Sequence, residues 1–215
     1  MRTWWFWMVG CLAACSSVVV PVERSYRLEL PEVQAPDAQR AGVLRVDCLQ
    51  LGTAIDCDRL LQQQGLRLQA RPLARWVAPL DRLVTDALVL GLSRARVCEL
   101  VKSAVDPGGE TWTLRGRIVD FAEGAGEAGR EARVTLELWL EDGRGLVFHD
   151  EFAQRVPVEA PADAGETDVE MMVVRALSAG LRQVVTDVVG RLHSTGALAA
   201  ARARSEAAAA AVPAR

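Results

Sequence analysis

Two histidines and several paired carboxylates are the side chains of this sequence that could act in acid–base or nucleophilic catalysis. His149 stands beside Asp150 and Glu151 in an alternating stretch typical of a strand, on the side we expect to face solvent. His193 ends an amphipathic stretch typical of a helix, where a cation is favoured. Adjacent carboxylates such as Asp150 and Glu151 point away from each other. Each position therefore has an ordinary structural explanation.

Sequence motifs give no support to an enzyme either. The chain has no G-x-S-x-G, P-loop or H-E-x-x-H pattern. The glycine-rich run from Gly124 lies between predicted strands and has no helix after it to hold a phosphate. The isolated histidines and the lack of a C-x-x-C pair predict no metal and no cofactor. The sequence thus predicts a protein that is not an enzyme.

Cys15 has the clearest chemistry, because its thiol follows a segment with the features of an export signal. Arg2 supplies a positive charge, residues 4–10 are apolar, and Leu12-Ala13-Ala14 precede the cysteine. This order resembles the lipobox of bacterial lipoproteins. The resemblance implies that residues 1–14 are a signal peptide and that Cys15 becomes the acylated first residue of the mature chain.

Acylation at Cys15 would hold the protein to a membrane, since each buried methylene contributes about 0.8 kcal/mol. Ser16 and Ser17 follow the cysteine instead of aspartate, and the enterobacterial sorting pattern then implies the outer membrane. Three alternatives stay open. Residues 4–20 are long enough for an uncleaved membrane span, a plain secretory signal would be cleaved elsewhere, and Cys11 is a second, poorer acylation candidate.

Cys48, Cys57 and Cys98 lie in the body of the chain. An exported protein can form disulfides. A bridge between Cys48 and Cys57, which lie close in sequence, is one interpretation, and separate buried thiols are the other.

Length and composition indicate one folded domain. Removing the signal leaves about 200 residues, and half of the whole chain is apolar and a quarter charged. The net charge of −3 is too small to indicate a nucleic-acid partner.

Alternating apolar and polar residues predict about seven strands. They lie among the segments 25–31, 43–51, 58–63, 66–71, 96–102, 111–121, 132–140 and 145–152. Two amphipathic helices are predicted, one opening at Pro79 and one from Thr167 to Leu192, with Thr167 and Glu170 at capping-box spacing. We therefore expect an α+β fold, with a mainly antiparallel sheet and both helices packed on one face.

The remaining segments complete the predicted organisation. Residues 15–24 form a lipidated tether, and residues 25–193 form the α+β domain. Glycine and charge in 122–131 predict a mobile hairpin loop, and the Ala/Arg-rich tail, 194–215, is expected to be disordered.

The face of the sheet turned away from the helices carries several arginines together with Val119, Phe121 and Trp139. Aromatic residues among arginines are typical of protein interfaces. Phe121 and Trp139 are therefore candidate interface residues, and a homo-oligomer is one partner arrangement that such a face favours. A loop covering Trp139 is the alternative.

The order of features along residues 12–192 resembles a known family. After the lipobox come Tyr-x-Leu-x-x-Pro, Asp-Cys-Asp-Arg, and Arg-Trp before a Pro-Leu helix start. The residues that carry this resemblance are Tyr26, Leu28, Pro31, Asp58, Arg59, Arg75, Trp76, Pro79 and Leu80. The family is that of the ABC-type transport auxiliary lipoproteins of the PqiC/YmbA type, which accompany MCE proteins.

This resemblance implies a non-catalytic accessory component of an intermembrane lipid transport system. It would be lipid-anchored in the outer membrane, face the periplasm, and dock onto an MCE-type protein and its ABC permease/ATPase complex. The alternative function is a periplasmic carrier that itself binds a lipid or another apolar ligand.

Overall fold

The computed structural model describes residues 22–29, 42–127, 129–161 and 164–194. Cys15, Pro31 and the segments predicted as signal peptide and tail lie outside these residues, except for the last helical residue, Ser194. Nine strands and two helices follow one another in the described part. They are β1 (Arg24–Tyr26), β2 (Val43–Val46), β3 (Gln50–Leu51), β4 (Arg59–Gln64), β5 (Arg67–Trp76), α1 (Leu80–Arg94), β6 (Leu100–Ser103), β7 (Trp112–Gly126), β8 (Gly129–Asp142), β9 (Gly145–Pro157) and α2 (Glu166–Ser194).

Strand β7 organises the sheet. One of its edges pairs with β8 along its full length, from Trp112 opposite Asp142 to Gly126 opposite Gly129. Its other edge takes β2, β3 and β4 in turn, all parallel to it. β9 pairs with β8, β6 with β2, β5 with β4, and β1 with β5. The result is one mixed, mostly antiparallel sheet, which confirms the predicted fold class.

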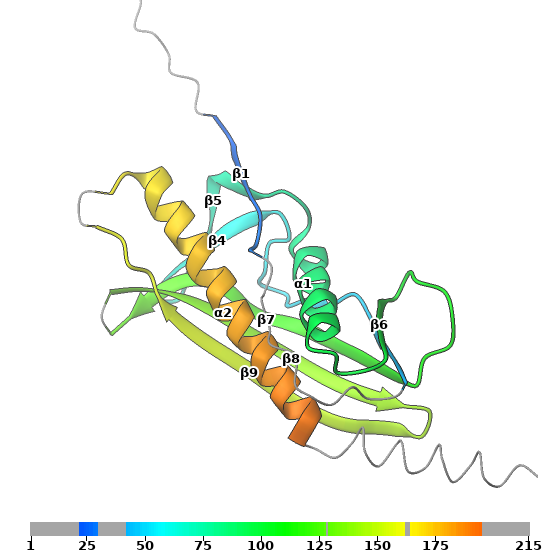
Figure 1. Cartoon of the computed structure of the whole chain (residues 1–215). Coiled ribbons are helices and arrows are strands. Elements are labelled where there is room, and N and C mark those ends of the chain that lie inside the picture. Colours follow the sequence, from blue (N-terminus) through cyan, green and yellow to red (C-terminus); the bar gives the residue numbers. More distant parts are fainter. Residues whose placement is uncertain (1–21, 30–41, 128, 162–163, 195–215) are drawn as a thin grey trace, which may run out of the picture.

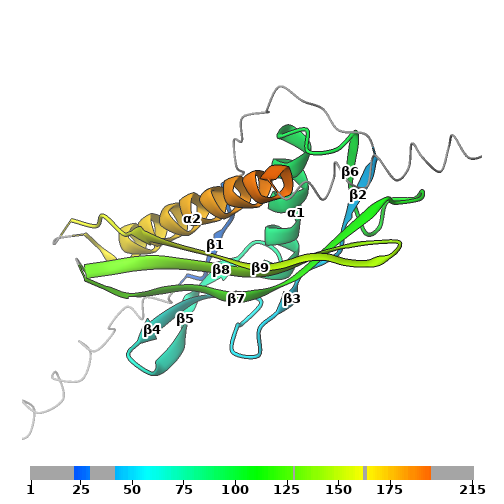
Figure 2. The same cartoon turned by 90° about the horizontal axis from the view of Figure 1, so that it is seen from below.

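Both helices pack against the same side of this sheet (Figures 1 and 2), as the apolar spacing predicted. On β8 every second residue, from Val134 to Leu140, is buried, and α2 packs against this strand. The backbone of α2 comes very close to the sheet at Gly180, where an added Cβ would lie 3.1 Å from Val134 Cγ2. Among the described residues, neither helix combines the length and the hydropathy needed to cross a membrane.

The predicted loop at 122–131 is wrong, because β7 and β8 continue through most of it. Its glycines make room for neighbouring side chains: a Cβ on Gly124 would meet the Arg133 guanidinium at 2.9 Å, and one on Gly126 would meet the Glu131 carboxylate at 2.7 Å. Glycine in a strand often marks such a close approach. The composition therefore reflects packing on the strand and not a mobile loop.

Two other segments differ from the alternation pattern. The single strand expected over 43–51 is broken, because the Leu49 N–H donates to Thr85 Oγ1 on α1 instead of to a strand. The strand expected from Arg96 begins only at Leu100, because α1 extends to Arg94 and Arg96 takes a positive φ of 49°.

Gly116 in the middle of β7 offers a sharp test of this packing. A Cβ there would lie 2.4 Å from Leu138 Cδ2 and 2.5 Å from the Glu137 carbonyl oxygen. We expect Gly116→Ala to lower the free energy of unfolding by about 1–3 kcal/mol, measured by denaturant titration. Gly143→Ala is the matched control, since nothing lies within 4 Å of its Cβ position. Equal stability of the two variants would contradict the packing of β7 against β8.

Candidate functional site

The folded part of the chain that the structure describes begins at β1, which adds a short parallel strand to the edge of β5. Arg24 lies opposite Ala74 and Tyr26 opposite Trp76, and the Val77 N–H donates to the Tyr26 carbonyl over 2.8 Å. β1 is therefore the first described element that ties the chain to the sheet.

The residues of the family motif meet beside β1. The Trp76 N–H donates to the Asp58 carbonyl, and the Leu80 N–H donates to the Cys57 carbonyl, each over 2.8 Å. Arg75 lies 3.3 Å from the Asp58 carboxylate and 3.5 Å from that of Glu23. The motif therefore fastens β4, β5 and the start of α1 to one another.

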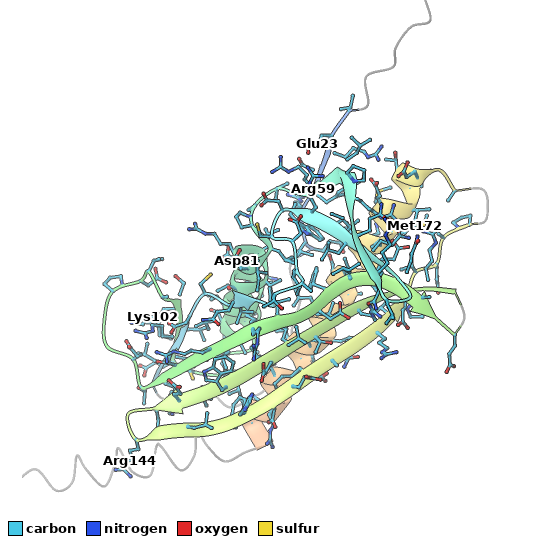
Figure 3. The ribbon with its side chains drawn as sticks, turned by 180° about the vertical axis from the view of Figure 1, so that it is seen from behind. Glu23, Arg59, Asp81, Lys102, Arg144 and Met172 are labelled. Carbon is cyan, nitrogen blue, oxygen red and sulfur yellow. The ribbon has the colours of Figure 1, made fainter. Side chains whose placement is uncertain are left out.

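Two further motif residues have backbone roles. Arg59 lies opposite Arg75 in the β4–β5 pair, and Figure 3 shows it at the same end of the molecule as Glu23. Pro79 is the N-cap of α1, and its carbonyl accepts from the Arg82 and Leu83 N–H groups at 3.1 Å. The sequence predicts that the helix opens at Pro79. In the structure Pro79 instead precedes the first helical turn.

Phe121 is a core residue, and its prediction as an interface residue is wrong. It is 1% exposed, and its ring packs edge-on against Trp76, with centroids 5.9 Å apart. The reason is a register shift between Ile118 and Asp120, a bulge that leaves Val119 unpaired and reverses which face the later residues take. Strict alternation placed Phe121 on the wrong side.

Trp139 is half-buried and alternates along β8 with the buried Leu138 and Leu140, so it lies on the outer face of the sheet, the face turned away from the helices. Its direct neighbours are Arg115 on β7 and His149 on β9, and the His149 ring centroid is 5.9 Å away. Strand residues, and not a loop, flank it. Trp139 is thus an aromatic side chain set among charged ones.

Paired charges cover the rest of this outer face. Glu137 accepts from Arg117 at 2.6 Å and lies 2.8 Å from His149 Nε2. The hydrogen bond from Arg117, and then that from His149, lower the pKa of Glu137. Arg115 lies 2.9 Å from Asp47 and 3.1 Å from Glu141. These groups satisfy one another and form a polar surface.

A second charged group connects α2 with β5, β7 and β8, and its central members are buried. Glu123 and Glu170 are each 1% exposed, and Arg71 is 9% exposed. Arg71 lies 2.6 Å from Glu123 and 3.9 Å from Glu170, and Arg130 lies 2.9 Å from the other oxygen of Glu123. We call these four residues, with Arg24 and Tyr26, the buried ionic cluster.

Arg24 and Tyr26 connect this cluster to β1. The Arg24 guanidinium donates to both oxygens of Glu170, at 3.0 and 3.1 Å, and the Tyr26 hydroxyl donates to it at 2.7 Å. One carboxylate on α2 therefore holds the strand at which the described chain begins. Burial, followed by the hydrogen bond to Glu170, raises the pKa of Tyr26 to about 12.

Tyr26 is the one tyrosine in the sequence, so its titration can be read directly from tyrosinate absorbance. We expect a midpoint at about pH 12 in the folded protein, against about 10 in the unfolded chain. Since the folded pKa is the higher one, this group's contribution to stability is complete below pH 10 and is lost as the pH rises toward 12. Glu170→Gln should move the midpoint part-way toward 10. A midpoint near 10 in protein that is still folded by circular dichroism would contradict the Tyr26–Glu170 contact.

Sequence reasoning missed this cluster, although one signal was present. Glu170 lies three and four residues before Val173 and Val174, within the apolar stripe of α2. A carboxylate on such a stripe needs a buried partner. The capping-box spacing predicts a role for Glu170 at the start of the helix, whereas its side chain turns inward to Arg24 and Tyr26.

Cys48 and Cys57 are free thiols in the structure, which contradicts the interpretation that a disulfide joins them. Each sulfur has a carboxylate of its own: Cys48 Sγ lies 3.5 Å from Asp81, and Cys57 Sγ lies 3.3 Å from Asp58. Burial raises the pKa of Cys48, and the hydrogen bond to Asp58 raises that of Cys57. Both thiols are therefore held protonated and are poor nucleophiles.

Comparisons with known proteins identify a family for this chain. The model of a family described as "ABC-type transport auxiliary lipoprotein component" matches residues 26–189. The chain belongs to this family. No curated protein matched the sequence of this chain.

Two solved structures share the fold of this auxiliary lipoprotein. One is a DUF330 protein from Xanthomonas campestris, 20% identical, with a TM-score of 0.68 over 80% of this chain and 96% of that one. The other is an uncharacterized protein, 16% identical, with a TM-score of 0.60 over 80% and 99% of the two chains. At these identities the likeness establishes the fold alone.

Two clefts lie on the described surface of this auxiliary lipoprotein. One, of about 210 Å³, lies between the start of α1 and β2, and Cys48, Arg82 and Val105 are among its lining residues. The other, of about 630 Å³, lies at the β7–β8 turn beside Arg130 and Arg155. Within the described ranges, no three histidine, cysteine, aspartate or glutamate residues are grouped to hold a metal ion.

Proposed function

We propose that this auxiliary lipoprotein is a non-catalytic adaptor of an MCE-associated ABC-type lipid transport system. It is anchored in the outer membrane by lipid on Cys15 and faces the periplasm. The observation that carries the proposal is the family match, which spans residues 26–189 and so covers almost all of the described body. The charges of that body support it, because they pair with one another instead of converging on an open site.

The anchor fits the way the body begins. Arg24, nine residues after Cys15, is fixed to Glu170, so the body stays within about 30 Å of a lipid on Cys15. We expect the wild-type protein to fractionate with the outer membrane and Cys15→Ser to be lost from that fraction. Cys11→Ser is the control and should behave as wild type. Release of Cys11→Ser, with Cys15→Ser retained, would place the anchor at the other cysteine.

Docking is proposed to use the outer face around Trp139. This half-buried indole is flanked by Arg115 and His149, and tryptophan and arginine are the residues on which binding energy concentrates at protein interfaces. The occupant is the MCE-type protein that works with the ABC permease and ATPase. A second copy of this chain is a further partner for the same face.

Affinity purification from native membranes tests the docking. Tagged wild-type protein should retain the MCE-type protein and the ABC ATPase, and Trp139→Ala should lose them. Leu146→Ala is the control, since Leu146 is 64% exposed but lies at the β8–β9 turn. If both variants retained the MCE-type protein and the ATPase equally, Trp139 would be excluded from the docking interface.

Native mass spectrometry separates the adaptor from the carrier. The close approach of α2 to β8 at Gly180 favours the adaptor, because it leaves no layer of lipid between helix and sheet there. The extracted protein should carry no stoichiometric lipid beyond that on Cys15. A bound lipid in the body would support the carrier, and sedimentation of the same sample would report whether the chain self-associates.

A further inference from the structure

The turn between β4 and β5 projects an apolar side chain into solvent. Leu66 is fully exposed and Leu68 is 37% exposed, next to a turn in which Gly65 takes a positive φ of 60°. The Gln63 side chain donates to the Gly65 carbonyl over 2.8 Å and so braces the turn. Figure 2 shows this hairpin on the side of the sheet opposite to the helices. Leu66 therefore stands at the tip of a braced projection.

The hairpin differs in charge from the rest of the chain. Residues 59–76 contain four arginines and no aspartate or glutamate, whereas the whole chain has a net charge of −3. Arg71 and Arg75 pair with carboxylates of neighbouring elements. Arg67 follows Leu66 and is exposed at the tip. Arg67 has no ion pair with another described residue, and an exposed leucine beside such an arginine matches the boundary between anionic headgroups and acyl chains.

The register of β1 shows where the chain before it leads. β1 runs parallel to β5 with Arg24 opposite Ala74, so the preceding chain leaves β1 toward the Arg67 end of β5. Seven residues of strand separate Ala74 from Arg67, which is at most about 24 Å. Nine residues join Cys15 to Arg24, which is at most about 30 Å. A lipid on Cys15 can therefore lie level with the tip of the hairpin.

We propose that the β4–β5 tip is a second membrane contact, in which Leu66 enters the headgroup region of the bilayer and Arg67 pairs with lipid phosphate. This inference rests on the proposed lipid anchor. The acyl chains supply the attachment, and the tip sets how the body is turned on the membrane. It thereby fixes which surfaces face the periplasm.

The opposite end of the molecule carries a comparable apolar residue that should not touch lipid. Val105 is 90% exposed in the loop before β7, and the same loop carries Asp106 and Glu110. This loop leads into the end of β7 at which Trp112 pairs with Asp142. β4 pairs with β7 near the other end, at Glu123. Val105 is thus a control matched in exposure and in side-chain type.

The test uses the full-length acylated protein, extracted in detergent and placed in vesicles of phosphatidylethanolamine and phosphatidylglycerol. Cys48 and Cys57 are exchanged for serine, and an environment-sensitive fluorophore is attached to Leu66→Cys or to Val105→Cys. We expect a blue shift and quenching by spin-labelled lipid at position 66 and neither at position 105. Adding Arg67→Glu should reduce the quenching at position 66.

Flotation of the vesicles separates the two ways of failing. Protein that floats while both labels behave alike would overturn the membrane contact and leave the anchor intact. Protein that does not float would overturn the anchor and the contact with it. A label at position 66 that is shielded only when the transport proteins are added would show that the tip binds protein, and this too would overturn the proposal.

Discussion

Replacing Glu123 with alanine should lower the free energy of unfolding by about 3–5 kcal/mol. Glu123 is 1% exposed and accepts from Arg71 at 2.6 Å and from Arg130 at 2.9 Å. Its removal leaves the Arg71 guanidinium in the interior with only Glu170, 3.9 Å away. An uncompensated buried charge is among the most destabilising changes a single substitution can make. Denaturant titration followed by circular dichroism measures the loss.

Two further variants test the ionic explanation of this loss. Glu127→Ala removes an exposed carboxylate from the same hairpin and should leave stability within about 0.5 kcal/mol of wild type. The double variant Arg71→Met with Glu123→Leu should recover much of the stability lost in Glu123→Ala, because neither charge then remains buried. A double variant that is as unstable as Glu123→Ala would contradict the ionic explanation.

Trp76→Ala should lower the free energy of unfolding by about 3–5 kcal/mol, which is the usual effect of deleting a large buried aromatic side chain. Trp76 is 5% exposed, packs edge-on against Phe121, and donates its backbone N–H to the Asp58 carbonyl. The backbone bond survives the substitution, but the ring contact is lost and a cavity forms beside Phe121. Thermal and denaturant unfolding both report this change.

Trp139→Ala is the comparison, because it removes the same side chain from a half-buried position on the outer face. It should reduce stability far less than Trp76→Ala and should act on partner binding instead. The two tryptophans thus separate a folding role from a docking role. Equal loss of stability at both positions would contradict the assignment of Trp76 to the core and of Trp139 to the surface.

The sheet and helices were predictable where one face of an element meets the core and the other meets solvent. On β8, alternation from Val134 to Leu140 gave the buried residues correctly, and the apolar stripe gave α2. Alternation failed at Phe121, because a bulge at Val119 adds one residue and reverses the face. The loop predicted from glycine and charge over 122–131 was also wrong, because at Gly124 the glycine makes room for the Arg133 side chain within a strand.

One part of the candidate site was predictable from the sequence and another part was not. The motif around Arg75 and Trp76 could be recognised, because its residues are close in sequence and keep a fixed order. The buried ionic cluster could not, since Glu123, Arg71 and Glu170 come from three separate elements and meet only after the sheet and α2 have packed. No local pattern contains that information. The lipid anchor, in contrast, is a property of a short segment, and it stays a prediction of the sequence.

The central claim is that lipid on Cys15 holds a folded recognition body at the membrane. Growth of the producing bacteria with radioactive palmitate, followed by immunoprecipitation, tests it most directly. We expect a labelled wild-type protein and an unlabelled Cys15→Ser variant. A wild-type protein without label, or a Cys15→Ser variant labelled as strongly as wild type, would contradict it.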